Sequence, residues 1–345
     1  MDKKEKKKFP LWAKILLGVV IVILAVAIGA FVFLNSKLSK INKVNDADTT
    51  QVDPSQETFD IDEDVAKSVE DGTAENVIDP EDVDWGDVDV NVMKDSDVVN
   101  ILLIGQDRRE GEGRERSDSM IICSINKKTN KIILSSVMRD LYVPIPGYSD
   151  NRINAAYQFG GMPLLDQVME ESLGVHIDAN VEVDFEGFIN ALTQVGNLDI
   201  ELNSAEAEYL NKNGWSLTEG VNSMTPEQLL AYARTRYVGH SDWERTDRQR
   251  RVLMAAFNKV KGEDVGTLLD LADKIFPSLT TDMSNMQIMG YVYTVATNNI
   301  TEIENYRIPV EGTYECKTLR KGMEVLVPNL TENSKYLQQY IYGEQ

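Results

Sequence analysis

A run of twenty uncharged, almost wholly apolar residues, 15–34, sets the strongest limit on how this 345-residue chain can fold. At a rise of about 1.5 Å per residue, a helix of this length spans the roughly 30 Å hydrocarbon core of a bilayer. Six lysines precede the run and three follow it, which favours a cytoplasmic N-terminus and an exported C-terminal bulk. A cleaved signal peptide is the alternative, because residues 25–27 (AVA) resemble a cleavage site, but the apolar run continues beyond them. The sequence therefore predicts a single-pass cell-membrane protein with residues 1–14 in the cytoplasm.

Charge is unevenly distributed along the chain, whose formal net charge is -21. Residues 1–45 hold nine lysines and two acids, whereas residues 46–97 hold 19 acids and two lysines. Such a self-repelling stretch, poor in aromatic residues, is typical of an extended chain that does not fold alone. We therefore predict an acidic extracellular linker over residues 35–97 and a folded extracellular domain over residues 98–345. The acidic balance excludes the broad basic surface of a nucleic-acid-binding protein.

The pattern of the domain predicts an α/β fold, with a mixed β-sheet covered by helices on both faces and preceded by one transmembrane helix. It begins with a continuous apolar run at 98–105, which is typical of a strand buried on both faces. A turn at 127–130 then joins two apolar segments into a hairpin. Further strands are predicted at 177–183, 198–202, 303–309 and 323–327, and helices at 163–173, 185–195, from 226, from 241, 264–276, 284–297 and 329–342.

The two cysteines, Cys123 and Cys316, both lie in the predicted exported part, where a disulfide is permitted. Two buried free thiols account for them equally well, because sequence does not show that they meet. Only two histidines are present and no Cys-x-x-Cys spacing occurs, so we expect no zinc site.

Six arginines lie between residues 232 and 251 of this acidic chain. Arginine suits phosphate and carboxylate groups because its planar fork donates to two oxygens at once. If the segment from Ser241 onward is helical, residues 242, 245, 249, 252 and 256 share one face that is polar at its start and apolar beyond. The alternative is a solvated basic surface, with Glu244 and Asp247 in simple ion pairs.

Two earlier segments carry the same chemistry at predicted strand ends: Asp107, Arg108, Arg116 and Asp118 in one, and Arg139 with Asp140 in the other. Ligands of open α/β sheets bind where strands end and loops begin. Arginines with spaced aspartates suit a diphosphate and a divalent cation, because Mg²⁺ takes one or two carboxylates and completes its shell with water and phosphate oxygens. Ordinary ion pairs are the alternative for each segment.

Seven ordered motifs resemble the LytR-CpsA-Psr family of Gram-positive envelope proteins, over a core of residues 98–260. They are ILLIGQDRR (101–109), RSDSM (116–120), SSVMRDLYVPIPG (135–147), RINAAYQFGG (152–161), VDFEGF (183–188), LLAYARTRY (229–237) and DWERTDRQRRVL (242–253). The resemblance implies a phosphotransferase. Such a ligase moves a wall teichoic acid or capsular polysaccharide from an undecaprenyl pyrophosphate carrier to peptidoglycan, leaving a phosphodiester bond. A non-catalytic polyprenyl-phosphate-binding regulator and a lipid pyrophosphatase are the alternatives.

The same resemblance assigns roles to individual residues. It implies that the pyrophosphate is held by Arg116, Arg139, Arg234, Arg236, Arg245 and Gln249, and that Mg²⁺ or Mn²⁺ is held by Asp107 and Asp118. Asp242 is implied to deprotonate the acceptor hydroxyl, with Arg245 and Arg116 as catalytic partners. Two positions depart from the family pattern: Glu244 stands where members often have Gly, and Arg152 where many have Lys.

Overall fold

The computed structural model describes residues 33–44, 49–108, 113–236, 238–239, 242–261, 263–297, 300 and 302–343. The predicted cytoplasmic residues and all but the last two positions of the predicted membrane helix lie outside them. Among the described residues, no helix is long and apolar enough to cross a bilayer. The chain divides into two compact units, residues 1–40 and 41–345, and the second carries the features described below.

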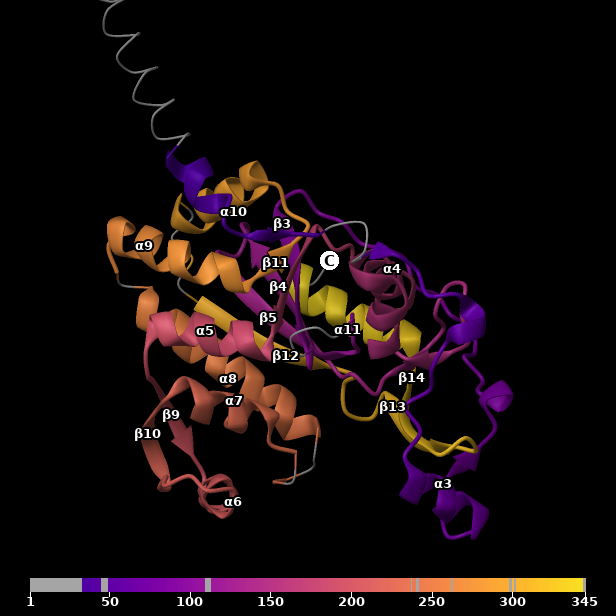
Figure 1. Cartoon of the computed structure of the whole chain (residues 1–345). Helices are drawn as coiled ribbons and strands as arrows, with labels where there is room; N and C mark the ends of the chain where they lie inside the picture. The colour runs from indigo at the N-terminus through magenta and orange to yellow at the C-terminus, as the bar shows by residue number, and fades with distance from the viewer. Residues whose placement is uncertain are drawn as a thin grey trace, which may run out of the picture. The chain divides into compact units, whose positions relative to one another are not determined.

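A seven-stranded mixed sheet forms the centre of this second unit (Figure 1). The two strands on either side of the turn at 127–130 pair as the predicted hairpin, with Ile121 opposite Ser136 in antiparallel register. Across the sheet the strands run in the order β1 (Asn42–Lys43), β11 (Thr280–Thr281), β8 (Ala179–Asp184), β3 (Val98–Gln106), β4 (Ser117–Asn126), β5 (Lys131–Val137) and β12 (Glu302–Ile308). The neighbouring pairs β3–β8 and β5–β12 are parallel.

Helices cover both faces of the sheet, so the predicted α/β architecture is confirmed. Leu102 and Ile104 of β3 belong to a core with α4 (Asn154–Leu173) and α11 (Leu330–Tyr342). The alternate residues Ile101 and Leu103 belong to a separate core with α8 (Asp242–Val260) and α10 (Asn285–Thr297) (Figure 1). Because successive strand side chains point to opposite faces, the continuous apolar run of β3 supplies both cores.

A smaller core packs beside the sheet, around the two-stranded sheet of β9 (Leu198–Leu202) and β10 (Gly220–Met224). Its helices begin at side-chain caps: Asp184 accepts from the Gly187 N–H at 2.8 Å, and Thr225 and Gln228 form a capping box. Such caps satisfy amide groups that the first helical turn leaves without partners. The helices are α5 (Phe185–Val195), α6 (Ser204–Lys212) and α7 (Pro226–Arg234).

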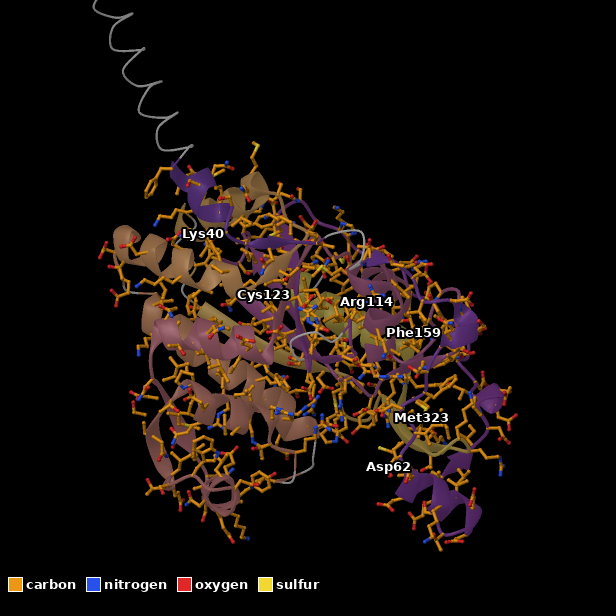
Figure 2. All side chains as sticks on the ribbon, in the orientation of Figure 1. Lys40, Asp62, Arg114, Cys123, Phe159 and Met323 are labelled. Atoms are coloured by element: carbon orange, nitrogen blue, oxygen red, sulfur yellow. The ribbon has the colours of Figure 1, made fainter. Side chains whose placement is uncertain are left out.

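The prediction of an extended linker is wrong for residues 49–97, which pack against the domain. Strand β2 (Val77–Ile78) pairs with β13 (Tyr314–Leu319), which itself pairs with β14 (Met323–Pro328). The N–H of Asp62, just before α3 (Glu63–Glu70), donates to the Gly322 carbonyl at 3.0 Å, close to Met323 (Figure 2). Acids of this segment meet arginines of the domain, since Arg152 lies 2.7 Å from Asp60 and Arg320 lies 2.6 Å from Asp79. These ion pairs give the acidic segment positively charged partners within the domain.

Smaller differences have local causes. The helix α4 consists of two helical pieces that meet at Gly161, and the prediction of 163–173 covers only the second piece. The φ of Gly161 is 65°, which breaks the helix two residues before Pro163. Cys123 and Cys316 are both free, which excludes the disulfide in this structure. The remaining elements are the 3-10 turns Pro54–Gln56, Pro80–Asp82 and Phe276–Ser278, strands β6 (Tyr142–Val143) and β7 (Asn151–Arg152), and helix α9 (Val265–Ile275).

Candidate functional site

A cavity of about 630 Å³ lies between the sheet and helices α5, α7 and α8. Most of its wall is apolar and comes from the core that contains α8 and α10 and from the smaller core around β9 and β10. The polar residues of the wall gather where β3 ends and β4 begins. The apolar part includes Leu103, Ile121, Val181, Val183, Phe188, Leu230, Val252 and Leu253, and the polar part includes Asp107, Asp118, Arg234, Arg236, Arg245 and Gln249. A cavity of this composition suits an amphiphile with a long apolar body and an anionic head.

Asp118 is the centre of the polar group. Its carboxylate lies 2.7 Å from Arg139 and 3.4 Å from Arg236, and its backbone carbonyl accepts from Arg245 at 2.6 Å. Burial alone would raise the pKa of Asp118, but the charges of Arg139 and Arg245 outweigh it and the pKa is lowered. Asp118 is therefore ionised at neutral pH and holds three arginines around one point.

Asp242 forms a second centre at the start of α8. It lies 3.1 Å from Arg245, 3.4 Å from Arg139 and 3.9 Å from Arg236. Burial opposes ionisation, but Arg245 and Arg139 outweigh it and lower the pKa of Asp242. Arg139 thus bridges Asp118 and Asp242. Burial alone would lower the pKa of Arg139, but Asp140, Asp118 and Asp242 outweigh it and raise that pKa.

Asp140, to which the sequence assigns no role, is hydrogen-bonded to Asp242. Its carboxylate also lies 3.3 Å from Arg152 and 3.6 Å from Arg139. Burial raises its pKa to about 6, helped by Asp242 and opposed by the two arginines. Two carboxylates in contact therefore have pKa values displaced in opposite directions, an arrangement that can hold and move a proton.

Arg152 explains one departure from the family pattern. Its guanidinium contacts Asp60 at 2.7 Å and Asp140 at 3.3 Å, and it donates to the Glu324 carbonyl at 2.6 Å. A lysine, with a single ammonium, does not present the planar fork that reaches all three. At the other departure, Glu244 packs against Gly239, where an added Cβ would lie 2.6 Å from the Glu244 carboxyl carbon.

Arg234 and Arg245 approach the cavity in different ways. Arg234, at the end of α7, lies over the Phe185 ring at 4.0 Å and 3.4 Å from Asp107, and it is largely exposed. Arg245 is buried, and burial together with the nearby Arg139 lowers its pKa to about 10. Gln249, one turn further along α8, accepts from the Ser119 hydroxyl at 3.0 Å. The predicted shared face of residues 245, 249 and 252 is confirmed, because all three line the cavity.

Two of the predicted pyrophosphate ligands, Arg116 and Arg139, are not among the residues that line the cavity. Arg139 contacts Asp118, which does line it. Arg116 is directed elsewhere, because its guanidinium donates to the Thr58 carbonyl at 2.6 Å. Burial lowers its pKa, and its nearest charges include Asp60 and Arg152. Arg116 therefore lies against the acidic N-terminal segment.

Arg248 is a residue near the site that the motif reasoning missed. Its side chain is 1% exposed, lies 2.8 Å from Glu206, and donates to the carbonyls of Thr235 and Val238 at 2.9 and 3.0 Å. These two carbonyls flank the segment that carries Arg236. Arg248 therefore fastens the end of α7 to α8 and α6. Three of its donors meet one acceptor on α6 and two on the stretch that follows α7, a pairing that the spacing of residues in the sequence does not reveal.

Asp107 and Asp118 both line the cavity, and their four carboxylate oxygens match the hard oxygen ligands of Mg²⁺. Within the described residues, no group of three or more His, Cys, Asp or Glu side chains is arranged to hold a metal ion. A cation at Asp107 and Asp118 would thus take its other ligands from water and substrate, as Mg²⁺ commonly does.

Comparison with known proteins gives consistent matches. The profile of the LytR_cpsA_psr family matches residues 55–339. The chain is 36% identical over 237 residues to the polyisoprenyl-teichoic acid–peptidoglycan teichoic acid transferase TagU of Oceanobacillus iheyensis, covering 65% of this chain and 72% of the relative. It is 26% identical over 250 residues to the regulatory protein MsrR of Staphylococcus aureus, covering 72% of this chain and 76% of the relative. Among solved structures, TagT bound to LI-WTA superposes with a TM-score of 0.58 at 25% identity, covering 71% of this chain and 91% of TagT.

Proposed function

The chain belongs to the LytR_cpsA_psr family, and from this premise we propose that it transfers a glycopolymer from a polyprenyl pyrophosphate carrier to peptidoglycan. The observation that carries the proposal is the cavity, whose apolar body ends at Arg234, Arg236 and Arg245. A prenyl chain matches the body and a pyrophosphate matches the arginines. The relative TagU is named a teichoic acid transferase and TagT binds LI-WTA, and both support the same substrate class.

The arginines perform most of the proposed chemistry. Phosphoryl transfer depends chiefly on positioning and on neutralising charge that spreads over the phosphate oxygens, with little covalent work for the protein. In the structure Arg139 and Arg236 contact Asp118 and Asp242. The aspartates hold the guanidinium groups in place before the anion arrives. The remaining N–H groups of these arginines then donate to the pyrophosphate oxygens.

Asp242 is the proposed general base. Its pKa is lowered, so it is ionised. It lies beside Arg139 and beside Arg245, which lines the polar end of the cavity. It takes the proton of the acceptor hydroxyl as that oxygen attacks the phosphorus bonded to the glycopolymer. Polyprenyl phosphate leaves, and the new bond is a phosphodiester.

We place Mg²⁺, or Mn²⁺, at Asp107 and Asp118, where it would neutralise negative charge on the pyrophosphate. Arg116 remains part of the proposal as a positioning residue. Its contact with Thr58 holds it within electrostatic range of Arg139, so its charge adds to the positive potential of the site.

The location follows from the N-terminal sequence. We propose that residues 15–34 anchor the protein in the cell membrane, with the N-terminus in the cytoplasm and the domain outside, where lipid-linked glycopolymer and peptidoglycan are both present. An anchored domain meets a substrate that is itself confined to the membrane.

A non-catalytic regulator is the second candidate, because the relative MsrR is named a regulatory protein. Both candidates bind a polyprenyl phosphate, and only the transferase needs Asp242.

Mass spectrometry of lipid that co-purifies with the detergent-extracted protein tests the shared premise. We expect a polyprenyl phosphate or pyrophosphate, and we expect Arg236→Ala to lose it. Recovery of diacyl phospholipid alone, in equal amounts from both proteins, would remove the basis for the transferase.

A further inference from the structure

A seam between α8 and the edge strand β12 carries positive charge that the proposed transfer does not use. On α8, Trp243, Asp247 and Arg250 share one face, at spacings of four and three residues. On β12, Asn305 and Arg307 point to the same side because they are two residues apart. Arg250 donates to Asn305 at 3.3 Å, and the Arg307 guanidinium lies over the Trp243 ring at 4.2 Å. The two faces therefore meet at both ends of the seam.

Charge in the seam is not balanced. Of the five residues named above, two are arginines and one, Asp247, is a carboxylate, which lies 3.4 Å from Arg250. Within the described part of the chain, Arg250 Nη1 and Arg307 Nε are buried nitrogen atoms without a hydrogen-bond partner. Arg250 is only 5% exposed, and burial lowers its pKa, with Arg307 contributing and Asp247 opposing. Buried donors of charged groups are costly to leave unmet, so a missing acceptor is expected here.

We propose that the α8–β12 seam is a second oxyanion site, in which Arg250 and Arg307 donate to one phosphate or carboxylate group. Each guanidinium has one buried nitrogen without a partner, Arg250 Nη1 and Arg307 Nε, and a charged donor suits an anion better than a neutral ligand. Asp247, whose side chain is 48% exposed, marks the side of the seam that is open to solvent.

The position of the seam suggests what the anion belongs to. Trp243 directly follows Asp242, so the seam begins next to the proposed general base, and neither Arg250 nor Arg307 lines the lipid cavity. An anion bound here is carried by one of the two reacting glycans: a phosphate of the glycopolymer or an anionic group of the acceptor. This last step rests on the proposed transfer, whereas the oxyanion site rests on the seam alone.

Phosphate binding tests the site without any transfer. Inorganic phosphate is titrated into the full chain in detergent micelles and followed by the broadening of its ³¹P NMR signal, in an Arg139→Ala background that weakens binding at the cavity. We expect Arg307→Gln and Arg250→Gln each to weaken the remaining binding roughly tenfold, the size of one lost charged hydrogen bond. Arg251→Gln is the matched control, because Arg251 contacts Glu206 and the Glu201 carbonyl instead. If the folded Arg250→Gln and Arg307→Gln variants bind phosphate as the control does, the proposal is overturned.

Kinetics then identify the source of the anion. In the transfer assay, Arg307→Gln is expected to raise the KM of one glycan roughly tenfold and to leave the KM of the other unchanged. A change confined to the acceptor assigns the seam to the acceptor, and a change confined to the donor assigns it to the glycopolymer phosphate. Unchanged KM values for both would contradict a substrate role, whereas absence of transfer in the wild-type protein would contradict the proposed function and leave the phosphate titration to decide on the site.

Discussion

Among single residues, the arginines differ in what their guanidinium groups touch. Arg139 and Arg236 contact both Asp118 and Asp242, whereas Arg251 contacts Glu206. A charged hydrogen bond contributes about 1.5–3 kcal/mol, so Arg139→Ala or Arg236→Ala should cost roughly tenfold to a hundredfold in affinity for a short-chain prenyl pyrophosphate. Lysine at either position should not restore it, because a point charge lacks the planar fork.

Titration of these variants with that ligand, by calorimetry, checks the prediction. Arg250→Ala and Arg251→Ala should bind it almost as the wild type does, because Arg250 contacts Asp247 and Arg251 contacts Glu206 instead of Asp118 or Asp242. Equal losses at positions 139, 236, 245, 250 and 251 would instead describe a diffuse basic surface.

Asp140 should give the transfer reaction a pH dependence. Burial raises its pKa to about 6, with Asp242 adding to the shift and Arg139 and Arg152 opposing it. Below this pH Asp140 is protonated and donates to Asp242. Above it, the new negative charge raises the proton affinity of Asp242, so the rate should rise as pH increases through about 6.

The measurement is kcat between about pH 5 and about pH 8 for the wild type and Asp140→Asn. The asparagine stays neutral and keeps the shape of the side chain, so the rise near pH 6 should disappear while affinity for prenyl pyrophosphate is retained. An unchanged rise in Asp140→Asn would assign the titration to another group.

Sequence reasoning grouped Asp118, Arg139, Arg236 and Arg245 because arginine and aspartate fall at strand and helix ends, where the loops of a sheet meet. The structure places these side chains in contact, and their functional roles stay predictions. The opposed pKa values of Asp140 and Asp242 were not predictable, since they depend on burial and on a contact across about a hundred residues. The direction of Arg116 was missed for a related reason, because its partner Thr58 lies in a segment that we expected to be extended.

At the scale of the elements, Arg248 links three segments through buried polar contacts. It joins α8 to Glu206 on α6 and to the Thr235 and Val238 carbonyls. Breaking a buried ion pair on one side typically costs about 3–5 kcal/mol, so Arg248→Ala should lower the free energy of unfolding by that order. Urea unfolding measures this effect.

Arg248→Lys keeps the charge but cannot meet three acceptors, so we expect it to fold while binding prenyl pyrophosphate more weakly, because the segment carrying Arg236 is released. Arg251→Lys, on the same helix and near the same glutamate, is the control. Wild-type binding and unfolding in Arg248→Lys would show that the fastening is unimportant.

Elements with strong local signals were predicted closely. Helix 185–195 and strand 198–202 match α5 and β9 at both ends, because Asp184 and Gly196 mark the helix ends and strict alternation marks the strand. Helix α6 was missed because it has few apolar residues, although Asn203 and Glu206 form a capping box that the sequence displays. Strand β2 could not be predicted, since its partner β13 is more than two hundred residues away.

For the whole molecule, the lysine-flanked run at 15–34 predicts an anchored protein with its domain outside the cell. Protease added to intact cells should degrade residues 98–345, while an epitope fused at the N-terminus survives until the membrane is permeabilised. Protection of the domain in intact cells would reverse the orientation.

The central claim is that the charged end of the cavity transfers a glycan as well as binding its carrier. Asp242→Asn tests it directly, because the amide keeps the shape of the side chain and removes its capacity to take a proton at neutral pH. The full chain in detergent micelles is given a prenyl-pyrophosphate-linked glycan and a peptidoglycan oligomer, and product formation and carrier binding are measured together. We predict that Asp242→Asn binds the carrier with wild-type affinity or better and forms no detectable product. Product formed at the wild-type rate by Asp242→Asn, or none formed by the wild-type protein itself, would contradict the proposed transfer.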